Sequence, residues 1–344
     1  MKKYRVAIVG LGRMASTIDD EVKDSLSDWV PYSIASSCQV IDSIDLVAGA
    51  DILPEKRDAF KQRWGVKALY EDYLEMIDKE KPDLVAICTK GDLHAEMGTK
   101  VAEAGVPMIY LEKAIACSMK EADMLLDACK KNKTLLNTGV LRRFNRQYRK
   151  ARQLIENGEI GQVRAIAHYG ATNLLHGHIH SIDTIMYLLG DPNAKSVWGE
   201  LLPRNTKIEN NRLNNDPSSI YQIEFENGVE AWTITAGNWD FEIWGSAGSI
   251  KSTDNGVGWV IRKPSSLKKG ATTEIPFPEC EGPSATAYCL LDLINAHEEG
   301  RQPIGNIEVT HHATEMCFAI AESHIQGKRI TMPISNRDLY IWHV

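Results

Sequence analysis

Two glycines near the start of the chain have the spacing of a diphosphate-binding turn. Gly10 and Gly12 follow the apolar run Tyr4–Val9 and precede Ala15, which gives Gly-x-Gly-x-x-Ala directly after an expected buried strand. Gly10 lets the chain turn sharply, and Gly12 lets a diphosphate approach the backbone because it has no Cβ atom. The small Ala15 lets the following helix pack closely, with its N-terminus toward the phosphates. The pattern predicts a dinucleotide site, although an ordinary strand-to-helix turn remains an alternative.

A carboxylate follows the glycines at the end of the next expected strand. Asp51 ends the apolar run Ile44–Ala50 and could accept hydrogen bonds from both ribose hydroxyls of NAD. Because this carboxylate would repel a ribose 2′-phosphate, NAD is favoured over NADP. A strand-end aspartate that caps the next turn is the alternative. Residues Thr17–Ser43 delay this strand and contain Pro31, which predicts an insertion, either a solvated acidic loop or a part of the pocket.

Alternating strands and helices must position these groups. Expected strands and helices alternate along this part of the chain, and the alternation predicts a right-handed, doubly wound parallel sheet, that is, a Rossmann domain over residues 1–140. Further strands are expected over residues 66–69, 83–89, 107–111 and 134–138, and helices over residues 54–64, 73–77, 93–104 and 118–131.

Residues 141–344 predict a second domain of the α+β class. Successive short strands predict a large, mostly antiparallel open sheet, and Asn227-Gly228 predicts a type I′ hairpin within it. The expected strands cover residues 163–169, 197–202, 219–226, 229–236, 240–245 and 248–252, and the expected helices cover residues 175–189, 285–299 and 309–326.

Three histidines lie at alternate positions near the start of the helix expected over residues 175–189. His176 and His180 are four residues apart and therefore share a face of that helix, whereas His178 is expected only to line a wall. Such a run can mimic a metal site, but the sequence shows no third ligand nearby, and no metal is expected. The nearby tryptophans, Trp232, Trp239 and Trp244, are expected to pack on the sheet rather than to bind a sugar.

Composition limits the class of protein. The 344 residues have a formal net charge of −7, which argues against a nucleic-acid-binding surface. No apolar run reaches membrane-spanning length, and the first residues lead directly into a strand, so neither a membrane span nor a secretory signal is expected. The seven cysteines are scattered without a Cys-x-x-Cys pair, as expected for free thiols in a reducing cytoplasm.

The order of several motifs resembles the Gfo/Idh/MocA family, which includes glucose-fructose oxidoreductase and inositol dehydrogenase. The matches cover nearly the whole chain and include the glycine motif and Asp51 at the end of the second strand. The other matches are Thr89–Glu96, similar to Thr-Pro-x-x-x-His-x-Glu; Glu112-Lys113-Ala114, similar to Glu-Lys-Pro; Arg143-Phe144, similar to Arg-Phe; and His180–Asp183 with Tyr187–Gly190, similar to the His-x-x-Asp helix.

The resemblance implies NAD as the cofactor and a role for each matching residue. His180 would be the general acid/base, and Lys113 would polarise the substrate oxygen and stabilise developing negative charge, although the two roles could be exchanged. His176 stands where many members carry an aspartate, so the family's Lys-Asp-His trio would become Lys113, His176 and His180, brought together over the nicotinamide by the cleft between the domains. The expected cofactor residues are Gly10, Gly12, Arg13, Met14, Asp51, Thr89, His94, Glu112, Lys113 and Arg143, and the expected substrate residues are Lys113, Asn173, His176 and His180.

Three features leave alternatives open. Ala114 stands where the family usually has proline, and because a cis peptide is rare without proline, the local backbone is expected to differ. Lys113 alone could also be a solvated charge after a strand. The arginines Arg142, Arg143, Arg146 and Arg149 are expected to form a solvated helix face, with Arg143 also a candidate to support the cofactor lobe.

The leading functional hypothesis is an NAD(H)-dependent oxidoreductase acting on a secondary hydroxyl of a sugar, polyol or glycoside. One alternative is a glycosidase that oxidises its substrate transiently, eliminates the glycosyl group and retains NAD. A second alternative is a non-catalytic sugar-binding protein that contains NAD. The resemblance also implies a homodimer or homotetramer.

Overall fold

The computed structural model describes residues 2–25 and 30–343, and the chain divides into two compact units. The first unit comprises Met1–Phe144, Pro283–His311 and His343–Val344, and the second comprises Asn145–Gly282 and His312–Trp342. The sequence predicts one boundary at residues 140 and 141. The structure instead assigns residues 283–311 and His343 to the first unit.

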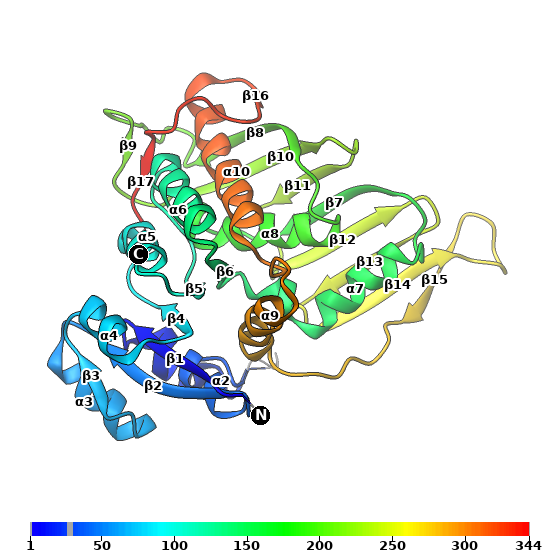
Figure 1. Ribbon diagram of the computed structural model, residues 1–344. Helices are drawn as coiled ribbons and strands as arrows, with labels where there is room; N and C mark the ends of the chain where they lie inside the picture. Colours follow the sequence, from blue (N-terminus) through cyan, green and yellow to red (C-terminus); the bar gives the residue numbers. More distant parts are fainter. Residues whose placement is uncertain (1, 26–29, 344) are drawn as a thin grey trace. The chain divides into compact units, whose positions relative to one another are not determined.

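A parallel six-stranded sheet forms the core of the first unit, in the order β3-β2-β1-β4-β5-β6 (Figure 1). Its central strand β1 is almost entirely buried and apolar because helices cover both faces of a doubly wound sheet. This order confirms the predicted Rossmann fold. The strands are β1 (Tyr4–Val9), β2 (Ile44–Ala50), β3 (Ala68–Tyr70), β4 (Leu84–Ile87), β5 (Met108–Leu111) and β6 (Leu135–Thr138).

The helices of this sheet begin and end where local signals place them. The Ser118 side chain accepts a hydrogen bond from the Glu121 amide and caps α6, as predicted. Gly65 has a φ of 73° and ends α3, a conformation that glycine adopts without steric cost. The helices are α3 (Pro54–Trp64), α4 (Tyr73–Glu80), α5 (His94–Glu103) and α6 (Met119–Asn132), with a short η2 (Gly91–Leu93) before α5.

The predicted insertion at residues 17–43 forms short helices rather than one continuous helix, as Pro31 suggests. The π turn η1 (Arg13–Thr17) leads into α1 (Ile18–Val22), and α2 (Ile34–Gln39) follows residues 26–29, which lie outside the described part. The Asp19 carboxylate accepts hydrogen bonds from the Tyr32 amide at 2.7 Å and the Ser33 amide at 3.1 Å. Asp19 therefore anchors the segment that precedes α2.

Helix α9 (Ala285–Glu299) joins the first unit through its apolar face. Leu290, Leu293 and Ile294 are buried in the same apolar cluster as Tyr4 and Ile8 of β1. At its N-terminus, the Ser284 hydroxyl donates to the Pro31 carbonyl at 2.6 Å and the Thr286 hydroxyl to the Tyr32 carbonyl at 2.9 Å. An amphipathic pattern shows that a helix covers a sheet but not which sheet, so the sequence could not predict this assignment.

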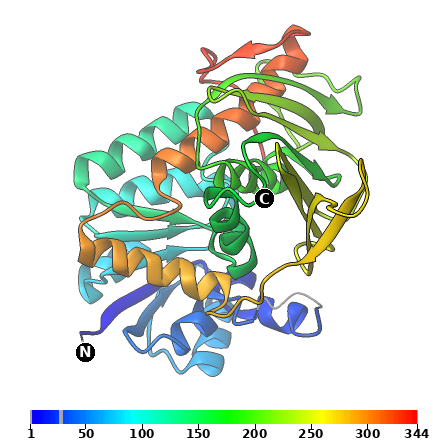
Figure 2. The same cartoon turned by 90° about the vertical axis from the view of Figure 1, so that its right-hand side faces the viewer.

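A nine-stranded sheet forms the second unit, in the order β15-β14-β13-β12-β7-β11-β10-β8-β16 (Figure 1 and Figure 2). Its neighbours pair antiparallel except β7 and β11, which confirms the predicted mostly antiparallel sheet. The strands are β7 (Val163–Tyr169), β8 (Ala194–Leu202), β10 (Ser218–Phe225), β11 (Glu230–Ile234), β12 (Asp240–Gly245), β13 (Gly248–Thr253), β14 (Gly258–Pro264), β15 (Thr272–Pro276) and β16 (Ile330–Thr331). A separate pair consists of β9 (Arg212–Leu213) and β17 (Tyr340–Ile341).

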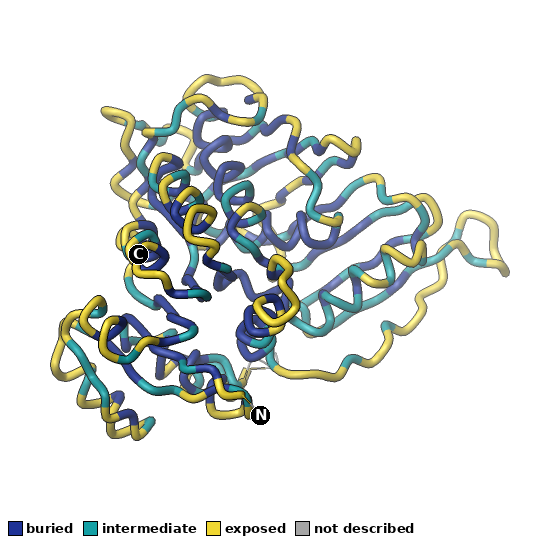
Figure 3. Tube along the Cα trace, viewed as in Figure 1, coloured by how far each residue is buried: buried dark blue, intermediate teal, exposed yellow. Residues whose placement is uncertain are grey.

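The edge of this sheet and one of its turns differ from the sequence prediction. Strands β14 and β15 were not expected. Strand β15 is exposed along its whole length and shows no apolar alternation, so no hydrophobic pattern predicts it (Figure 3). In the hairpin between β10 and β11 only Gly228 has a positive φ, at 80°, and its amide donates to the Phe225 carbonyl. A type I′ turn needs a positive φ at both central residues, so that turn type was wrong.

Helices cover one face of the nine-stranded sheet. The Ser181 hydroxyl of α8 (Ile179–Leu188) lies 2.8 Å from the Tyr221 hydroxyl of β10. Gly199 of β8 lies against Ile320 of α10 (Ile307–Gln326), so closely that a Cβ atom there would lie 2.7 Å from the Ile320 side chain. On the other face, Trp232 and Ile234 of β11 are 42% and 46% exposed. The remaining helical segments are α7 (Arg146–Glu156), η3 (Leu141–Phe144) of the first unit and η4 (Leu174–His178), a π turn before α8.

Candidate active site

A cavity of about 470 Å³ lies in the first unit at the carboxyl ends of β1, β2 and β4. In a doubly wound sheet, ligands bind at this edge where the strand order reverses. Four of the predicted cofactor residues line the cavity, namely Gly10, Gly12, Asp51 and Thr89. The other predicted cofactor residues, Arg13, Met14, His94, Glu112, Lys113 and Arg143, are not among its lining residues.

The two glycines of the first turn do different things. Gly10 has a φ of +82°, and a Cβ atom there would lie 2.8 Å from the Cys88 carbonyl oxygen, so glycine is required for the fold itself. Gly12 has a negative φ of −86°, and no described atom lies within 4 Å of a Cβ atom added to it. The space next to Gly12 opens onto the cavity and fits a diphosphate that approaches the backbone.

The Asp51 carboxylate is fixed beside the glycine turn. Its Oδ2 accepts from the Leu11 amide at 2.8 Å, and its Oδ1 accepts from the Leu53 amide at 3.0 Å. Asp51 therefore caps the turn after β2, and it also lines the cavity. Arg57 is nearby, where its Nη1 donates to the Asp51 carbonyl oxygen at 2.6 Å.

Exposed apolar side chains that belong to no predicted motif form part of the cavity wall. Ile52 and Leu53 are 75% and 43% exposed, and Leu93 is 37% exposed. Large apolar side chains exposed together on a concave surface are typical of a ligand site. The pair Ile52-Leu53 directly after Asp51 is the signal that could have revealed this wall.

Lys113 is half-buried in the turn that follows β5. The Lys113–Ala114 peptide is cis, so the expectation of a different local backbone was wrong. Histidine rings contact both backbone polar groups of Ala114, its carbonyl and its amide. Its carbonyl oxygen lies 2.8 Å from His94 Nδ1, and its amide donates to His343 Nε2 at 3.1 Å.

His94 and Glu112, both predicted cofactor residues, bind protein groups. His94 is buried, and its Nε2 lies 3.1 Å from the Thr89 carbonyl, so its ring links the Thr89 and Ala114 turns. Burial lowers the pKa of His94, which favours the neutral imidazole, and the single N–H of that ring donates to one of these two carbonyls. The buried Glu112 carboxylate accepts from the Tyr110 hydroxyl, and a Cβ atom on Gly139 would lie 2.7 Å from it.

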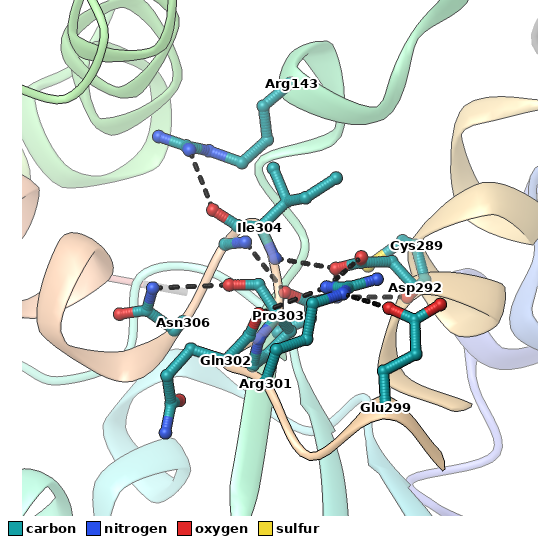
Figure 4. Close-up of polar contacts among 11 residues, drawn as sticks. Arg143, Cys289, Asp292, Glu299, Arg301, Gln302, Pro303, Ile304 and Asn306 are labelled. Carbon is teal, nitrogen blue, oxygen red and sulfur yellow. Dashed lines mark hydrogen bonds and ion pairs between the residues drawn. The ribbon is translucent and has the colours of Figure 1, made fainter. Parts of the chain in front are cut away.

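Arg13 and the arginines near residue 143 have different surroundings. Arg13 is exposed and donates to Glu21 at 2.8 Å, and this hydrogen bond raises the pKa of Arg13. Arg142 and Arg143 are buried, so the predicted solvated face was wrong for these two residues. Figure 4 shows the Arg143 guanidinium directed at the Ile304 carbonyl, to which its Nη1 donates at 3.0 Å.

The segment that receives Arg143 is part of a buried polar network (Figure 4). The Asp292 carboxylate of α9 accepts from the Ile304 amide at 2.7 Å and from Arg301 Nη1 at 2.9 Å. Asn137 of β6 donates to Asp292 at 3.1 Å, and its Oδ1 accepts from the Gly305 amide at 2.9 Å. Arg143 thus connects to α9 and β6, which gives it a structural role in the first unit.

His176, the first candidate histidine of the second unit, lies in the π turn η4. Asp216, which belongs to no predicted motif, accepts from the Leu175 amide at 2.8 Å and the His176 amide at 2.7 Å. Asn173 donates to the Asp216 carbonyl at 2.7 Å. Asp216 therefore satisfies the first amides of this turn, as a capping carboxylate does, and both Asn173 and His176 remain exposed.

His178 is a structural residue rather than part of a pocket wall. It is fully buried, its Nε2 lies 3.0 Å from the Ser219 carbonyl, and its Nδ1 lies 3.1 Å from the Ser181 hydroxyl. Burial lowers the pKa of His178 to about 4. Its neutral ring therefore joins α8 to β10.

His180 is half-buried at the start of α8. The Trp239 ring lies edge-on to it, with a centroid distance of 6.5 Å, and Trp239 also lies 4.9 Å from the buried His168 ring. Trp239 lies in the turn between β11 and β12 and has a positive φ of 59°. Within residues 2–25 and 30–343, no group of three histidine, cysteine, aspartate or glutamate side chains is arranged to hold a metal ion.

The first unit has the strand order, glycine turn and strand-end aspartate of a dinucleotide-binding oxidoreductase. Family models agree with this class. The Gfo/Idh/MocA oxidoreductase family matches residues 4–140 with its NAD-binding Rossmann fold and residues 167–332 with its C-terminal α/β domain. The chain belongs to the Gfo/Idh/MocA oxidoreductase family.

Several characterised proteins are similar to this chain. A scyllo-inositol 2-dehydrogenase (NAD(+)) of Bacillus subtilis is 26% identical over 84% of this chain and 84% of its own. A myo-inositol 2-dehydrogenase of Thermotoga maritima is 27% identical, but the match covers 46% of this chain and only 42% of that enzyme. The crystal structure of an aldose-aldose oxidoreductase from Caulobacter crescentus, complexed with glycerol, has the same fold, with a TM-score of 0.79 and 20% identity over 96% of this chain and 100% of that one. Among the helices of residues 2–25 and 30–343, none combines the length and the apolar content that a membrane-spanning helix needs.

Proposed function

We propose that this protein is an NAD-dependent dehydrogenase that oxidises a secondary hydroxyl of a polyol or sugar, or reduces the corresponding ketone. The observation that carries the proposal is the cavity of the first unit. There, an open space beside Gly12 and a fixed carboxylate at Asp51 lie at the switch point of a Rossmann sheet. NAD requires a space for its diphosphate, an acceptor for its ribose hydroxyls and an apolar wall for its base, and the cavity offers all three.

The cofactor residues of the proposal follow from this cavity. Gly10, Gly12 and the amides of the first turn would receive the diphosphate, and Asp51 would accept the ribose hydroxyls. Ile52 and Leu53 would lie against the adenine base. We propose NAD rather than NADP because a 2′-phosphate would face the Asp51 carboxylate, and because Arg57 is already bound to the Asp51 carbonyl.

The proposed chemistry needs one proton acceptor and one electrophile. Bound NAD supplies the hydride acceptor at its nicotinamide ring. We propose that His180 takes the hydroxyl proton, because an imidazole titrates near neutral pH without perturbation. Lys113 would hold the same oxygen and stabilise the negative charge that develops on it. His176 and Asn173 would bind further hydroxyls of the substrate.

The proposed substrate class follows from the site and from the relatives. Asn173 and His176 are exposed polar side chains at the turn that leads to His180, and such groups suit a ligand with several hydroxyls. The named relatives oxidise inositols, whose ring carries secondary hydroxyls throughout. A cyclic polyol or a pyranose is therefore the proposed substrate.

We also propose that the protein acts in the cytoplasm as a homodimer or homotetramer. The partly exposed Trp232 and Ile234 on the open face of the second unit's sheet support association between copies. Seven free cysteines, five of them buried, support a reducing compartment. We do not expect nucleic acid or membrane among the partners, since the net charge is −7.

A screen of NADH fluorescence tests the proposal. The protein is mixed with NAD or NADP and with a panel of inositols, hexoses and glucosides. We expect NADH to accumulate with at least one panel member and NAD to be preferred over NADP. Release of an aglycone without net NADH would instead indicate the retained-NAD glycosidase, and NAD binding without any turnover would indicate the non-catalytic sugar-binding protein. Either result would overturn the dehydrogenase proposal.

A further inference from the structure

The turn that carries Lys113 is held from two sides by histidine rings. Ala114 follows Lys113 directly and has no side chain beyond Cβ, so its backbone supplies the contacts that fix the turn. His94 Nδ1 lies 2.8 Å from the Ala114 carbonyl, and His343 Nε2 accepts from the Ala114 amide at 3.1 Å. His94 belongs to a motif noted in the sequence, whereas His343 lies more than two hundred residues beyond the turn it binds.

His343 uses both of its ring nitrogens on this one turn. It is 2% exposed, and its Nδ1 lies 3.4 Å from the Cys117 sulfur. Because Nε2 accepts a hydrogen bond, the proton of a neutral ring resides on Nδ1 and points to the sulfur, which is a weak acceptor. The ring thus contacts Ala114, directly after Lys113, and Cys117, three positions further on.

The same ring packs against the turn that follows β4. A Cβ atom on Gly91 would lie 2.3 Å from His343 Nε2, so the imidazole occupies the space that any larger residue at position 91 would need. Lys90 and Leu93, which belong to the same turn as Gly91, line the cofactor cavity. His343 therefore lies between a turn that forms the cavity and the turn that presents Lys113.

We propose that His343 is a positioning residue for Lys113. Its ring holds the Ala114 amide against the Gly91 turn and so fixes the position of Lys113. The proposal rests on the proposed function, in which Lys113 acts on the substrate oxygen. The rate of a catalysed step falls about a hundredfold when a catalytic group is displaced by about 1 Å. Release of the Lys113 turn on one side should therefore lower turnover strongly. The cofactor cavity itself keeps its glycines and Asp51, so NAD binding is retained.

Two substitutions separate the hydrogen bond from the packing. H343F keeps a ring over Gly91 but cannot accept from the Ala114 amide, whereas H343Q offers an amide oxygen to it. We expect H343F to lower kcat at least tenfold with the Kd for NAD within twofold of the wild type, and H343Q to restore kcat to within threefold. H312F is the matched control, because His312 Nε2 accepts from the Ala194 amide at 2.9 Å in the second unit; it should keep kcat.

A measurement without substrate or cofactor reads the contact directly. Hydrogen exchange of the Ala114 amide in the free protein should become at least tenfold faster in H343F and return toward the wild-type rate in H343Q. If H343F does not fold, C117A, which removes the sulfur partner of Nδ1, replaces it and should lower kcat at least threefold. The proposal is overturned if wild-type turnover is observed and the H343F or C117A enzyme keeps full kcat. An absence of wild-type turnover with every panel compound would instead refute the proposed function, and the exchange rates would still decide the positioning contact.

Discussion

The neutral state of His178 makes the stability of the second unit depend on pH. In the unfolded chain His178 has its ordinary pKa of 6.5, whereas in the folded protein burial lowers the pKa to about 4. Between these values the unfolded chain binds a proton that the folded protein does not bind. The stability from this residue is therefore present above about pH 6.5 and is lost as the pH falls toward 4. The two pKa values give a loss of about 2 kcal/mol between pH 7 and pH 5.

Urea unfolding at a series of pH values measures this loss. Six of the eight tryptophans lie in the second unit, so their fluorescence follows its transition. H178Q removes the titrating ring but keeps a side-chain amide that can donate to the Ser219 carbonyl, and it should be less stable than the wild type by about 1–3 kcal/mol at pH 7. The wild type should lose about 2 kcal/mol more than H178Q between pH 7 and pH 5. Parallel curves for the two proteins would show that His178 is already accessible to protons in the folded state, and would refute its assignment as a buried structural residue.

Two further predictions concern the cofactor cavity. G10A should destabilise the first unit by about 2 kcal/mol or more, since the new Cβ atom meets the Cys88 carbonyl at a positive φ, whereas G12A should change the stability by less than about 1 kcal/mol yet weaken NAD binding. Thermal unfolding and calorimetric titration with NAD distinguish the two, and equal effects of both changes on stability would contradict the separate roles. D51A should raise the Kd for NAD about 10–100-fold through loss of charge-assisted hydrogen bonds, and it should reduce the preference for NAD over NADP. An unchanged ratio of the two dissociation constants would exclude Asp51 as the residue that selects NAD.

Local patterns predicted the first unit well because its signals are short-range. The strand Tyr4–Val9 and the helix Pro54–Trp64 have the predicted bounds, and Gly10, Gly12 and Asp51 lie around one cavity as their spacing indicates. In each case the apolar period or the required backbone conformation is contained in a few consecutive residues.

The remaining features depend on contacts between distant segments. No local signal shows that α9 packs with the strands of the first unit, that Asp216 caps the turn before His176, or that His343 binds the Ala114 amide. The same limit applies to polar residues in a motif. Arg143 and Glu112 look like ligand residues in the sequence, but burial and partners such as the Ile304 carbonyl and the Tyr110 hydroxyl give them structural contacts.

The role of Lys113 in turnover is tested by the initial rate of NADH formation by the wild type and by K113A, with NAD and the best compound of the polyol and sugar panel. We expect a steady rate for the wild type and a rate at least a hundredfold lower for K113A, with the Kd for NAD nearly unchanged. A K113A rate equal to that of the wild type, or no NADH from the wild type with any compound while NAD remains bound, would contradict this role.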